Sequence, residues 1–323
     1  MNSRVSEPAW EAPARLPPMS ALRAFEAAAR LNSFSLAARE LFVTHSAVSH
    51  QIRGLEAQLG FPLFIREGRG VRLTPAGQEL AERTNAAFCE IGRTVARLRQ
   101  RANPRRLTVT TMPSFAARWL APRIGQFIEQ HPDVELNIIT TNAVLDFVRD
   151  GVDVAIRFGL GQSPPDETAE RLLEDELMVV ASPALLAGRA AARPSDLRMF
   201  PLLRADGEYW KPWFTRVGLD WDEPSTGLFF SDSSLILQAA LDGRGVALTR
   251  RRLCEREIAA GRLVQLFDET LASARGYWFV RPADSPLTPL AQRFRDWIFA
   301  EAGAADPVTA DPTDGIAMDA GRW

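Results

Sequence analysis

The chain has 323 residues, 46% of them hydrophobic, which is enough to form the cores of two or three domains and excludes an intrinsically disordered protein. No apolar run reaches the roughly 18 residues that a membrane helix needs, and the N-terminus lacks the apolar segment of a secretory signal. We therefore expect a cytoplasmic protein with no membrane partner.

Charge is distributed unevenly along the chain. Residues 1–106 contain 16 Arg against 9 acidic side chains, a net charge of +7, whereas the remainder has 22 basic and 31 acidic residues, a net charge of −9. A basic N-terminal part suits a polyanion such as DNA, and an acidic C-terminal part is repelled by one.

Residues 35–59 contain two short helical patterns joined by a turn of three or four residues. In the second pattern, four apolar residues share one side: Val48, Ile52, Leu55 and Leu59. Four polar residues share the opposite side: Ser46, Ser49, His50 and Arg53. This arrangement predicts a helix that packs through one face and inserts the other into the DNA major groove, with Thr44 or Ser46 as its N-cap. The alternative is an ordinary helical hairpin whose polar face points to water.

The next segment, residues 61–77, contains two strand-like runs around Gly68 and Gly70, which permit a tight hairpin turn. Three arginines cluster on it: Arg66, Arg69 and Arg72. A cationic hairpin beside a recognition helix is suited to hold backbone phosphates, so we expect a wing.

A long helix is expected from Pro75 to about Arg101, because this stretch has no internal proline and Asn103-Pro104 supplies a stop. Its apolar residues recur at helical spacing: Leu80, Ala87, Ile91, Val95 and Leu98. The stripe favours pairing with the same helix of a second copy, since an isolated long helix needs a partner. The alternative is an amphipathic helix that lies on its own domain.

Beyond Arg106 the pattern alternates between strands and helices, which is typical of parallel α/β domains. We expect strands at 107–111, 152–158 and 176–182, and helices at 115–129, 145–149 and 289–302. The chain is expected to leave a first lobe near Val180 and to re-enter it near Phe267. Residues 107–180 and 268–302 then form lobe 1, residues 181–267 form lobe 2, and a small-molecule effector binds in the cleft between them.

The run from Leu22 to Gly77, which ends in "LTPAG", resembles the N-terminal domain of LysR-type transcriptional regulators without a gap. The resemblance implies an α + α/β chain: a winged helix-turn-helix domain at 19–74, a dimerisation linker helix at 75–103, and a two-lobed effector-binding domain at 107–302. That last domain would have the type II periplasmic-binding-protein-like fold. Residues 1–18 would be a flexible N-terminus and residues 303–323 a disordered acidic tail.

The same resemblance assigns roles to the polar residues of the N-terminal domain. It implies base contacts by four residues: His45, Ser46, Ser49 and His50. It implies phosphate contacts by Arg53 and the wing arginines. Family members frequently carry Arg where this chain has His50, so one base contact is altered here.

In the C-terminal part, stretches such as "TTMPSFAARWLAPRI" and "GYWFV" are similar to the subgroup that contains the glycine-cleavage and β-lactamase regulators. That similarity implies an effector site lined by Ser114, one of Ser233 and Ser234, and Tyr277. Thr111 lies at the same strand-to-helix junction as Ser114. Each such hydroxyl has helix capping as its alternative role. Arg157 is expected either to pair with an effector carboxylate or to form an ion pair between the lobes.

These features predict a ligand-responsive transcriptional regulator that binds a promoter operator in double-stranded DNA as a homodimer or homotetramer, with RNA polymerase as a further partner. No phosphate loop, metal-ligand spacing or nucleophile motif occurs in the sequence, so we expect neither an enzyme nor a cofactor. The alternative is a cytoplasmic small-molecule-binding module that uses its N-terminal helices for protein association.

Overall fold

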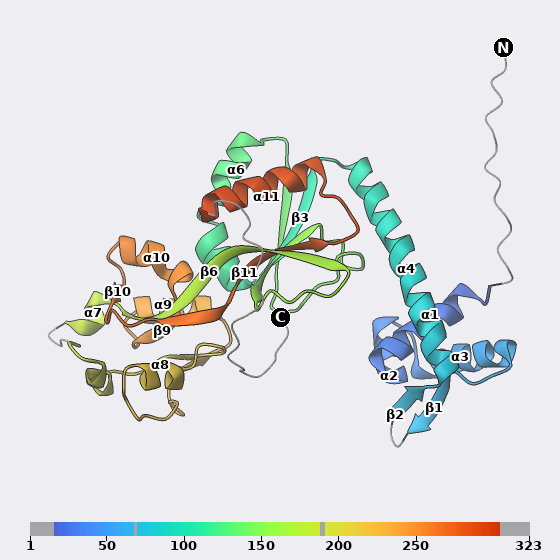
Figure 1. Ribbon diagram of the computed structural model, residues 1–323, viewed down its shortest axis with the longest axis horizontal. Coiled ribbons are helices and arrows are strands. Elements are labelled where there is room, and N and C mark those ends of the chain that lie inside the picture. The colour runs from blue at the N-terminus through green and yellow to red at the C-terminus, as the bar shows by residue number, and fades with distance from the viewer. Residues whose placement is uncertain (1–15, 68–69, 188–190, 304–323) are drawn as a thin grey trace, which may run out of the picture. The chain divides into compact units, whose positions relative to one another are not determined.

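The computed structural model, drawn in Figure 1, describes residues 16–67, 70–187 and 191–303. The chain forms two compact units, Met1–Arg97 and Leu98–Trp323. Within the described ranges, no helix combines the length and the apolar composition needed to span a bilayer. Nor do three or more His, Cys, Asp or Glu side chains in these ranges converge as metal ligands.

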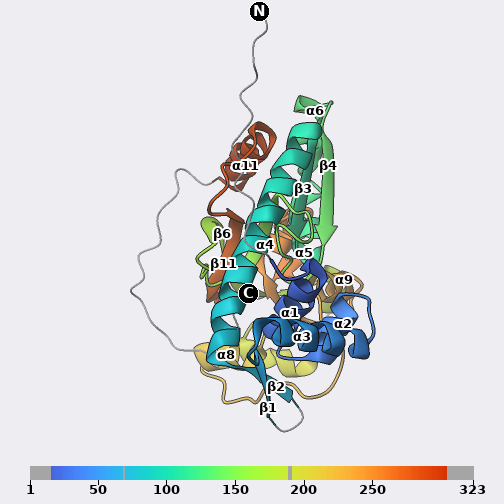
Figure 2. The ribbon, with the colours of Figure 1, turned by 90° about the vertical axis from the view of Figure 1, so that its right-hand side faces the viewer.

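The first unit contains the predicted helix-turn-helix and wing (Figure 2). Helices α1 (Met19–Leu31), α2 (Phe34–Glu40) and α3 (His45–Leu59) precede an antiparallel hairpin of β1 (Phe64–Glu67) and β2 (Gly70–Leu73). The Thr44 hydroxyl accepts a hydrogen bond from Ala47 N at 3.2 Å, so Thr44 rather than Ser46 is the N-cap of α3. Gly60, with a φ of +82°, ends α3 in a left-handed cap that a glycine adopts without strain.

The core of this unit fixes the orientation of α3. Alanines at the crossing of α1 and α2 allow close approach of the backbones, and Val48 and Ile52 of α3 are buried against them. Phe25 and Leu55 form a second buried cluster with Leu63. Because one face of α3 is filled by this core, the opposite face is left to solvent.

Helix α4 (Pro75–Ala102) confirms the predicted long helix and is about 42 Å long at 1.5 Å per residue. Its start is anchored by Thr74, whose hydroxyl accepts a hydrogen bond from Gly77 N at 3.0 Å and donates to Pro62 O at 2.9 Å. A Cβ at Gly77 would lie 2.1 Å from Leu63 O, so only glycine fits at this close contact.

The second unit is built on a mixed sheet, whose strands are β3 (Arg106–Thr111), β4 (Glu135–Thr140), β5 (Val154–Gly159), β6 (Glu167–Ala181), β9 (Ala247–Arg250), β10 (Val264–Gln265) and β11 (Leu271–Pro282). Strand β3 pairs in parallel with β4 and β5, whereas β11 runs antiparallel between β5 and β6. The sheet is therefore mixed, and the expected parallel pairing holds for β3, β4 and β5. Two of the antiparallel strands, β6 and β11, are the long crossings, in which the chain passes between the lobes in opposite directions.

Strands β6 and β11 extend through both lobes of this unit (Figure 1). Strand β6 pairs with β11 from Glu167 to Leu177 and with β9 from Leu177 to Val180. The register of the pair shifts between Ala272 and Gly276. The lobe boundaries at Val180 and Phe267 stay predictions.

Helices cover the sheet in both lobes. Lobe 1 carries α5 (Pro113–Phe115), the π-helical turn η1 (Ala116–Leu120), α6 (Ile124–Gln130) and α11 (Pro289–Ala302). Lobe 2 carries α7 (Pro183–Leu186), the 3₁₀ turn η2 (Pro194–Met199), α8 (Trp210–Arg216), α9 (Ser233–Leu241), α10 (Arg251–Ala259), and the short parallel pair β7 (Arg204–Ala205) and β8 (Phe229–Phe230). One buried cluster joins Phe115 and Ile156 of lobe 1 to Ile236 and Leu253 of lobe 2. The two lobes therefore share a continuous core.

Two predicted helices differ in the structure. The helix expected at 115–129 is interrupted at Ala121–Arg123, where Pro122 has no N–H to donate and the preceding turn is π-helical. The helix expected at 145–149 is only a turn, because the Asp146 carboxylate accepts the N–H groups of Val148 and Arg149, at 2.9 and 2.6 Å. These bonds replace the start of a helical ladder.

Candidate functional site

Helix α3 presents the predicted polar face. His45, Ser46, His50 and Arg53 are exposed and Ser49 is half-buried. The Arg53 Nε donates to Ser49 O at 3.2 Å, which holds the guanidinium stem along the helix. The face carries hydroxyl, imidazole and guanidinium groups, which are the side chains that hydrogen-bond to base edges and phosphates.

The hairpin contributes one described arginine side chain. Arg72 on β2 lies opposite Ile65 in the register and is exposed. The side chain of Arg66 and the whole of Arg69 lie outside the described residues, so their predicted phosphate contacts stay predictions. An exposed cationic side chain on a strand next to α3 is suited to a phosphate of the same duplex.

Phe42, in the turn between α2 and α3, was missed by the sequence analysis. Its side chain is 95% exposed, and its φ of +56° places it in the left-handed region. A phenylalanine in this conformation costs of order 1–2 kcal/mol. The strained turn is held by Val43 N, which donates to Ala38 O at 3.0 Å.

The predicted dimerisation stripe on α4 divides into two parts. Leu80 packs against the core of the first unit, as in the alternative that places the helix on its own domain. The other members are exposed: Ala87, Ile91, Val95 and Leu98. Large apolar side chains that recur on one exposed helix face are suited to a partner helix.

In the second unit, polar residues gather on one face of the sheet at the crossing between the lobes. Tyr277 of β11 lies opposite Leu173 of β6, and Arg250 of β9 lies opposite Leu177. Directly opposed residues share a face, and alternate residues of a strand do so as well. Asp175, between Leu173 and Leu177, therefore lies on the same face as Tyr277 and Arg250.

Thr111 extends this face into lobe 1. It pairs with Ile156 of β5, and Phe158, two residues further along β5, pairs with Tyr277. The rings of Phe115 and Phe158 lie 4.7 and 4.9 Å from the Tyr277 ring. The face thus has an aromatic border on the lobe 1 side.

Glu208 and Ser233 complete the polar cluster from lobe 2. The Ser233 hydroxyl donates to Glu208 Oε1 at 2.7 Å, and Arg250 Nη1 donates to Ser233 Oγ at 3.2 Å. Arg250 Nη1 lies 3.6 Å from Glu208 Oε1, and its guanidinium carbon lies 4.1 Å from the centre of the Phe158 ring. Glu208 is 1% exposed, so this is a buried charge pair.

Burial dominates the electrostatics of the cluster. It raises the pKa of Asp175 from 3.8 to about 6, and it raises the pKa of Glu208 despite the opposing effect of Arg250. Burial alone would lower the pKa of Arg250, but Glu208 and Asp175 raise it overall. Burial also raises the pKa of Tyr277, so its hydroxyl stays neutral.

Several polar atoms of this face have no hydrogen-bond partner among the described residues although they are buried: Thr111 Oγ1, Asp175 Oδ2, Glu208 Oε2 and Tyr277 OH. Buried polar groups are normally hydrogen-bonded, and each exception needs an explanation. The Tyr277 hydroxyl lies beside Asp175 and Arg250 without good hydrogen-bond geometry to either. Such a concentration of unused donors and acceptors is typical of a ligand site.

The structure brings together three of the predicted effector residues, namely Thr111, Ser233 and Tyr277. Ser114 is buried next to Phe115, which contacts Tyr277. The hydroxyl of Ser234 donates a hydrogen bond to Asp232, and Asp232 rather than Ser234 is the N-cap of α9.

Arg157 lies apart from this cluster. Its guanidinium donates to Glu167 Oε1 at 3.1 Å and to Leu145 O at 3.3 Å, all within lobe 1. An ion pair between the lobes is formed by two other residues. Arg118 of η1 lies 3.4 Å from Glu257 of α10.

Sequence analysis missed Asp175, Glu208 and Arg250. Asp175 had a detectable signal, since it is a carboxylate at an inward-facing position between Leu173 and Leu177 in an otherwise apolar alternation. Glu208 and Arg250 had no such signal in the sequence, because their proximity depends on the packing of β9 against the loop after β7.

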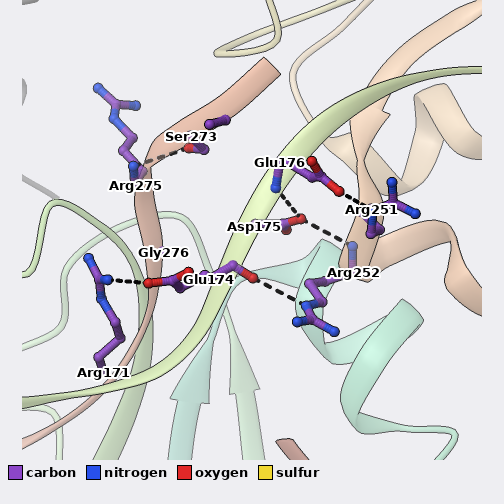
Figure 3. A pocket seen from close by; sticks show the side chains of 10 residues that line it. Arg171, Glu174, Asp175, Glu176, Arg251, Arg252, Ser273, Arg275 and Gly276 are labelled. Atoms are coloured by element: carbon purple, nitrogen blue, oxygen red, sulfur yellow. Dashed lines mark hydrogen bonds and ion pairs between the residues drawn. The ribbon is translucent and has the colours of Figure 1, made fainter. Parts of the chain in front are cut away.

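A pocket of about 340 Å³ lies at the crossing strands beside Asp175 (Figure 3). Its wall combines acidic residues of β6 with Arg251 and Arg252 at the start of α10 and the bulge of β11 at Gly276. Asp175 Oδ1 accepts hydrogen bonds from Glu176 N and Arg252 N, at 2.9 and 3.2 Å. The carboxylate thus links this pocket to the buried face.

Both parts of the chain match known families. Residues 19–78 match the family described as bacterial regulatory helix-turn-helix protein, lysR family, and residues 100–303 match the LysR substrate binding domain. The chain is 40% identical over 293 residues to the glycine cleavage system transcriptional activator of Escherichia coli (strain K12), which covers 90% of this chain and 95% of the relative.

Solved effector domains are similar to the second unit. The effector domain of the transcriptional regulator AmpR of Pseudomonas aeruginosa matches with a TM-score of 0.53 and 31% identity, over 61% of this chain and 95% of that domain. A Citrobacter freundii effector-binding domain with three substitutions matches with a TM-score of 0.53 and 29% identity, over 61% and 98%. In that variant valine replaces a threonine, alanine a serine and phenylalanine a tyrosine, so each change removes a hydroxyl.

Proposed function

The chain belongs to the family of LysR-type transcriptional regulators, DNA-binding proteins with an effector-binding domain, and from this premise we propose which residues bind DNA and which bind the effector. The observation that carries the function is the match to a transcriptional activator along 95% of that protein's length. The alternative of a binding module with helices for protein association has no support, because residues 19–78 match a DNA-binding family.

We assign base contacts to the polar face of α3, through His45, Ser46, Ser49 and His50. Arg53 and the wing arginines Arg66, Arg69 and Arg72 contact phosphates. The assignment is supported by the exposure of His45, His50 and Arg53 on the face opposite buried Val48 and Ile52. A recognition helix reads the groove with its N-terminal residues, and these positions occupy the first half of α3.

We assign the effector to the buried face between the lobes, with Thr111, Ser233 and Tyr277 as hydroxyl contacts and Arg250 as the cation. Support comes from the unpaired Thr111 and Tyr277 hydroxyls. The substituted Citrobacter freundii domain lost hydroxyls of the same three types. Ser114 and Ser234 border this face, while Arg157 is placed to stabilise lobe 1 through Glu167.

Effector binding regulates DNA binding only if the effector has different affinities for two arrangements of the lobes. One polar contact that couples the lobes is made by Arg118, which donates to Ser234 O on α9 at 3.0 Å. An effector that contacts Ser233 acts on the same end of α9.

The remaining assignments follow from the family. We propose that the exposed stripe of α4 forms the contact between two copies, in a homodimer or a homotetramer. The assembly binds an operator in double-stranded promoter DNA, in the cytoplasm. RNA polymerase is a further partner of the bound regulator. The relatives are transcriptional regulators, and we assign the chain no enzymatic activity.

The DNA assignment is tested by gel shift on the protein's own promoter region. Ser49→Ala and Arg53→Ala should each weaken binding about tenfold, as expected for the loss of a specific base or phosphate contact. Gln58→Ala is the control, because Gln58 is exposed near the far end of α3. Equal affinity of all four proteins would refute the assignment.

A further inference from the structure

The buried face between the lobes holds more negative than positive charge. Arg250 is its one guanidinium among the described residues, against the carboxyl groups of Glu208 and Asp175. The nearest other guanidiniums are engaged elsewhere, Arg251 with Glu176 and Arg252 with Glu255. Two buried carboxylates that share one buried guanidinium are costly, so this face is short of positive charge.

The unpaired atoms show where the deficit lies. Glu208 uses Oε1 for Ser233, and Asp175 uses Oδ1 for two backbone N–H groups, while Glu208 Oε2 and Asp175 Oδ2 accept nothing from the described residues. Both side chains are more than nine-tenths buried, at 1% and 8% exposure. Two carboxylate oxygens that lack donors call for a cationic donor rather than for an anion.

Resting on the proposed effector site, we propose that the effector carries a cationic amine and that Asp175 Oδ2 and Glu208 Oε2 hold its nitrogen. An ammonium group has three donors and one positive charge, so it satisfies both oxygens and neutralises the excess carboxylate. The hydroxyls of Thr111 and Tyr277 then bind the polar remainder of the molecule. Arg250 is already paired with Glu208, so its positive charge reduces the repulsion between the carboxylates of Glu208 and Asp175.

Aromatic contacts restrict the size of the group next to the nitrogen. The rings of Phe115 and Phe158 border Tyr277 on the lobe 1 side, and Phe158 also lies against Arg250. Primary amines on a compact carbon skeleton fit this border, whereas quaternary amines cannot donate hydrogen bonds to the carboxylates.

The experiment uses the full-length protein and pairs of compounds that differ only by the amine. We choose L-alanine with propionate, glucosamine with glucose, and putrescine with 1,4-butanediol, and measure the melting temperature and the affinity by calorimetry. At least one amine should bind and raise the melting temperature, and its nitrogen-free counterpart should bind about tenfold more weakly or not at all. Equal binding within the pair, or no binding by any amine, overturns the proposal.

Two isosteric variants locate the nitrogen. Asp175→Asn keeps the oxygen that accepts the backbone N–H groups, and Glu208→Gln keeps the acceptor for Ser233, but each loses a charge. Both should lose about tenfold in affinity for the amine and retain DNA binding. Glu174→Gln, an exposed neighbour of Asp175, should bind like the wild type.

If the Glu208→Gln variant fails to fold, the Asp175→Asn variant alone tests whether these carboxylates bind the amine. Unchanged amine affinity in Asp175→Asn overturns the proposal. A nitrogen-free compound that binds and alters DNA binding would refute the amine while leaving the regulator function intact. Loss of DNA binding by the wild type would instead refute the proposed function.

Discussion

Arg118 of η1 donates a hydrogen bond from Nη2 to the carbonyl oxygen of Ser234 in the first turn of α9, at 3.0 Å, and so joins lobe 1 to lobe 2. The same guanidinium lies 3.4 Å from Glu257, which also pairs with Arg262. The Arg118 side chain is 16% exposed, so its contacts are largely shielded from water. Arg118 therefore connects lobe 1 to the helix that carries Ser233.

Replacement of Arg118 by leucine should lower the free energy of unfolding by about 1–3 kcal/mol, because the Ser234 carbonyl loses a donor and Glu257 loses one of two cations. Urea denaturation of the full-length chain measures the change. Arg149→Leu is the control, since Arg149 pairs with Asp150 at an exposed position and surface pairs contribute little. An equal, small effect of both changes would contradict a role for Arg118 between the lobes.

Asp175 makes stability depend on pH in a defined direction. Its pKa is about 6 in the folded protein against an ordinary 3.8, so the folded state retains the proton over this range after the unfolded chain has lost it. Stability contributed by the protonated group is present below about pH 4, falls between about pH 4 and 6, and is absent above. The charged or titratable groups around it are Arg250, Arg252, Glu208, Tyr277 and Cys254.

The Asp175→Asn variant tests this direction. The free energy of unfolding of the variant minus that of the wild type should be larger at about pH 7.5 than at about pH 4.5, by about 2 kcal/mol. The comparison between the two proteins cancels the titration of all other groups. A difference that is independent of pH would show that the Asp175 carboxyl titrates normally.

Phe42 offers a stability gain. Because its φ is +56° and its ring is 95% exposed, Phe42→Asn should relieve strain without loss of burial and raise the free energy of unfolding by about 1 kcal/mol. Phe42→Ala is the control, because alanine lacks the side-chain amide through which asparagine tolerates the left-handed region. Thermal unfolding distinguishes the two variants, and a less stable Asn variant would indicate that the ring has a structural contact.

The α4 stripe predicts the effect of charge on assembly. Ile91→Glu places a carboxylate on the exposed apolar face and should shift sedimentation equilibrium toward monomer, whereas Asn85→Glu, on a different face of α4, should not. A dimer that persists in Ile91→Glu would exclude this stripe as the contact between copies.

Sequence periodicity was sufficient for the elements whose contacts are local. The polar and apolar faces of α3, the hairpin, the length of α4 and the last helix from Pro289 all follow from spacing, caps and glycines. The turn at Asp146 was not predictable in this way, because a side-chain carboxylate competed with the helical ladder.

The effector site was only half predictable for the same reason. Thr111 and Tyr277 lie at strand positions whose importance a family resemblance implies. The pairing of Glu208 with Arg250 depends on two segments 42 residues apart in the sequence meeting next to β6. No local sequence pattern predicts a contact between segments so far apart in the chain.

Because β6 and β11 are continuous strands with residues in both lobes, lobe 1 is encoded by two separate stretches of the gene, and lobe 2 begins inside one of these strands and ends inside the other. A hybrid regulator made by exchanging only lobe 2 would need one junction inside β6 and one inside β11. Each junction would interrupt the hydrogen bonds between these two strands. We expect recombination between relatives to exchange the second unit as a whole, with the junction near Arg97. A DNA-binding unit of new specificity would then be combined with an unchanged effector specificity.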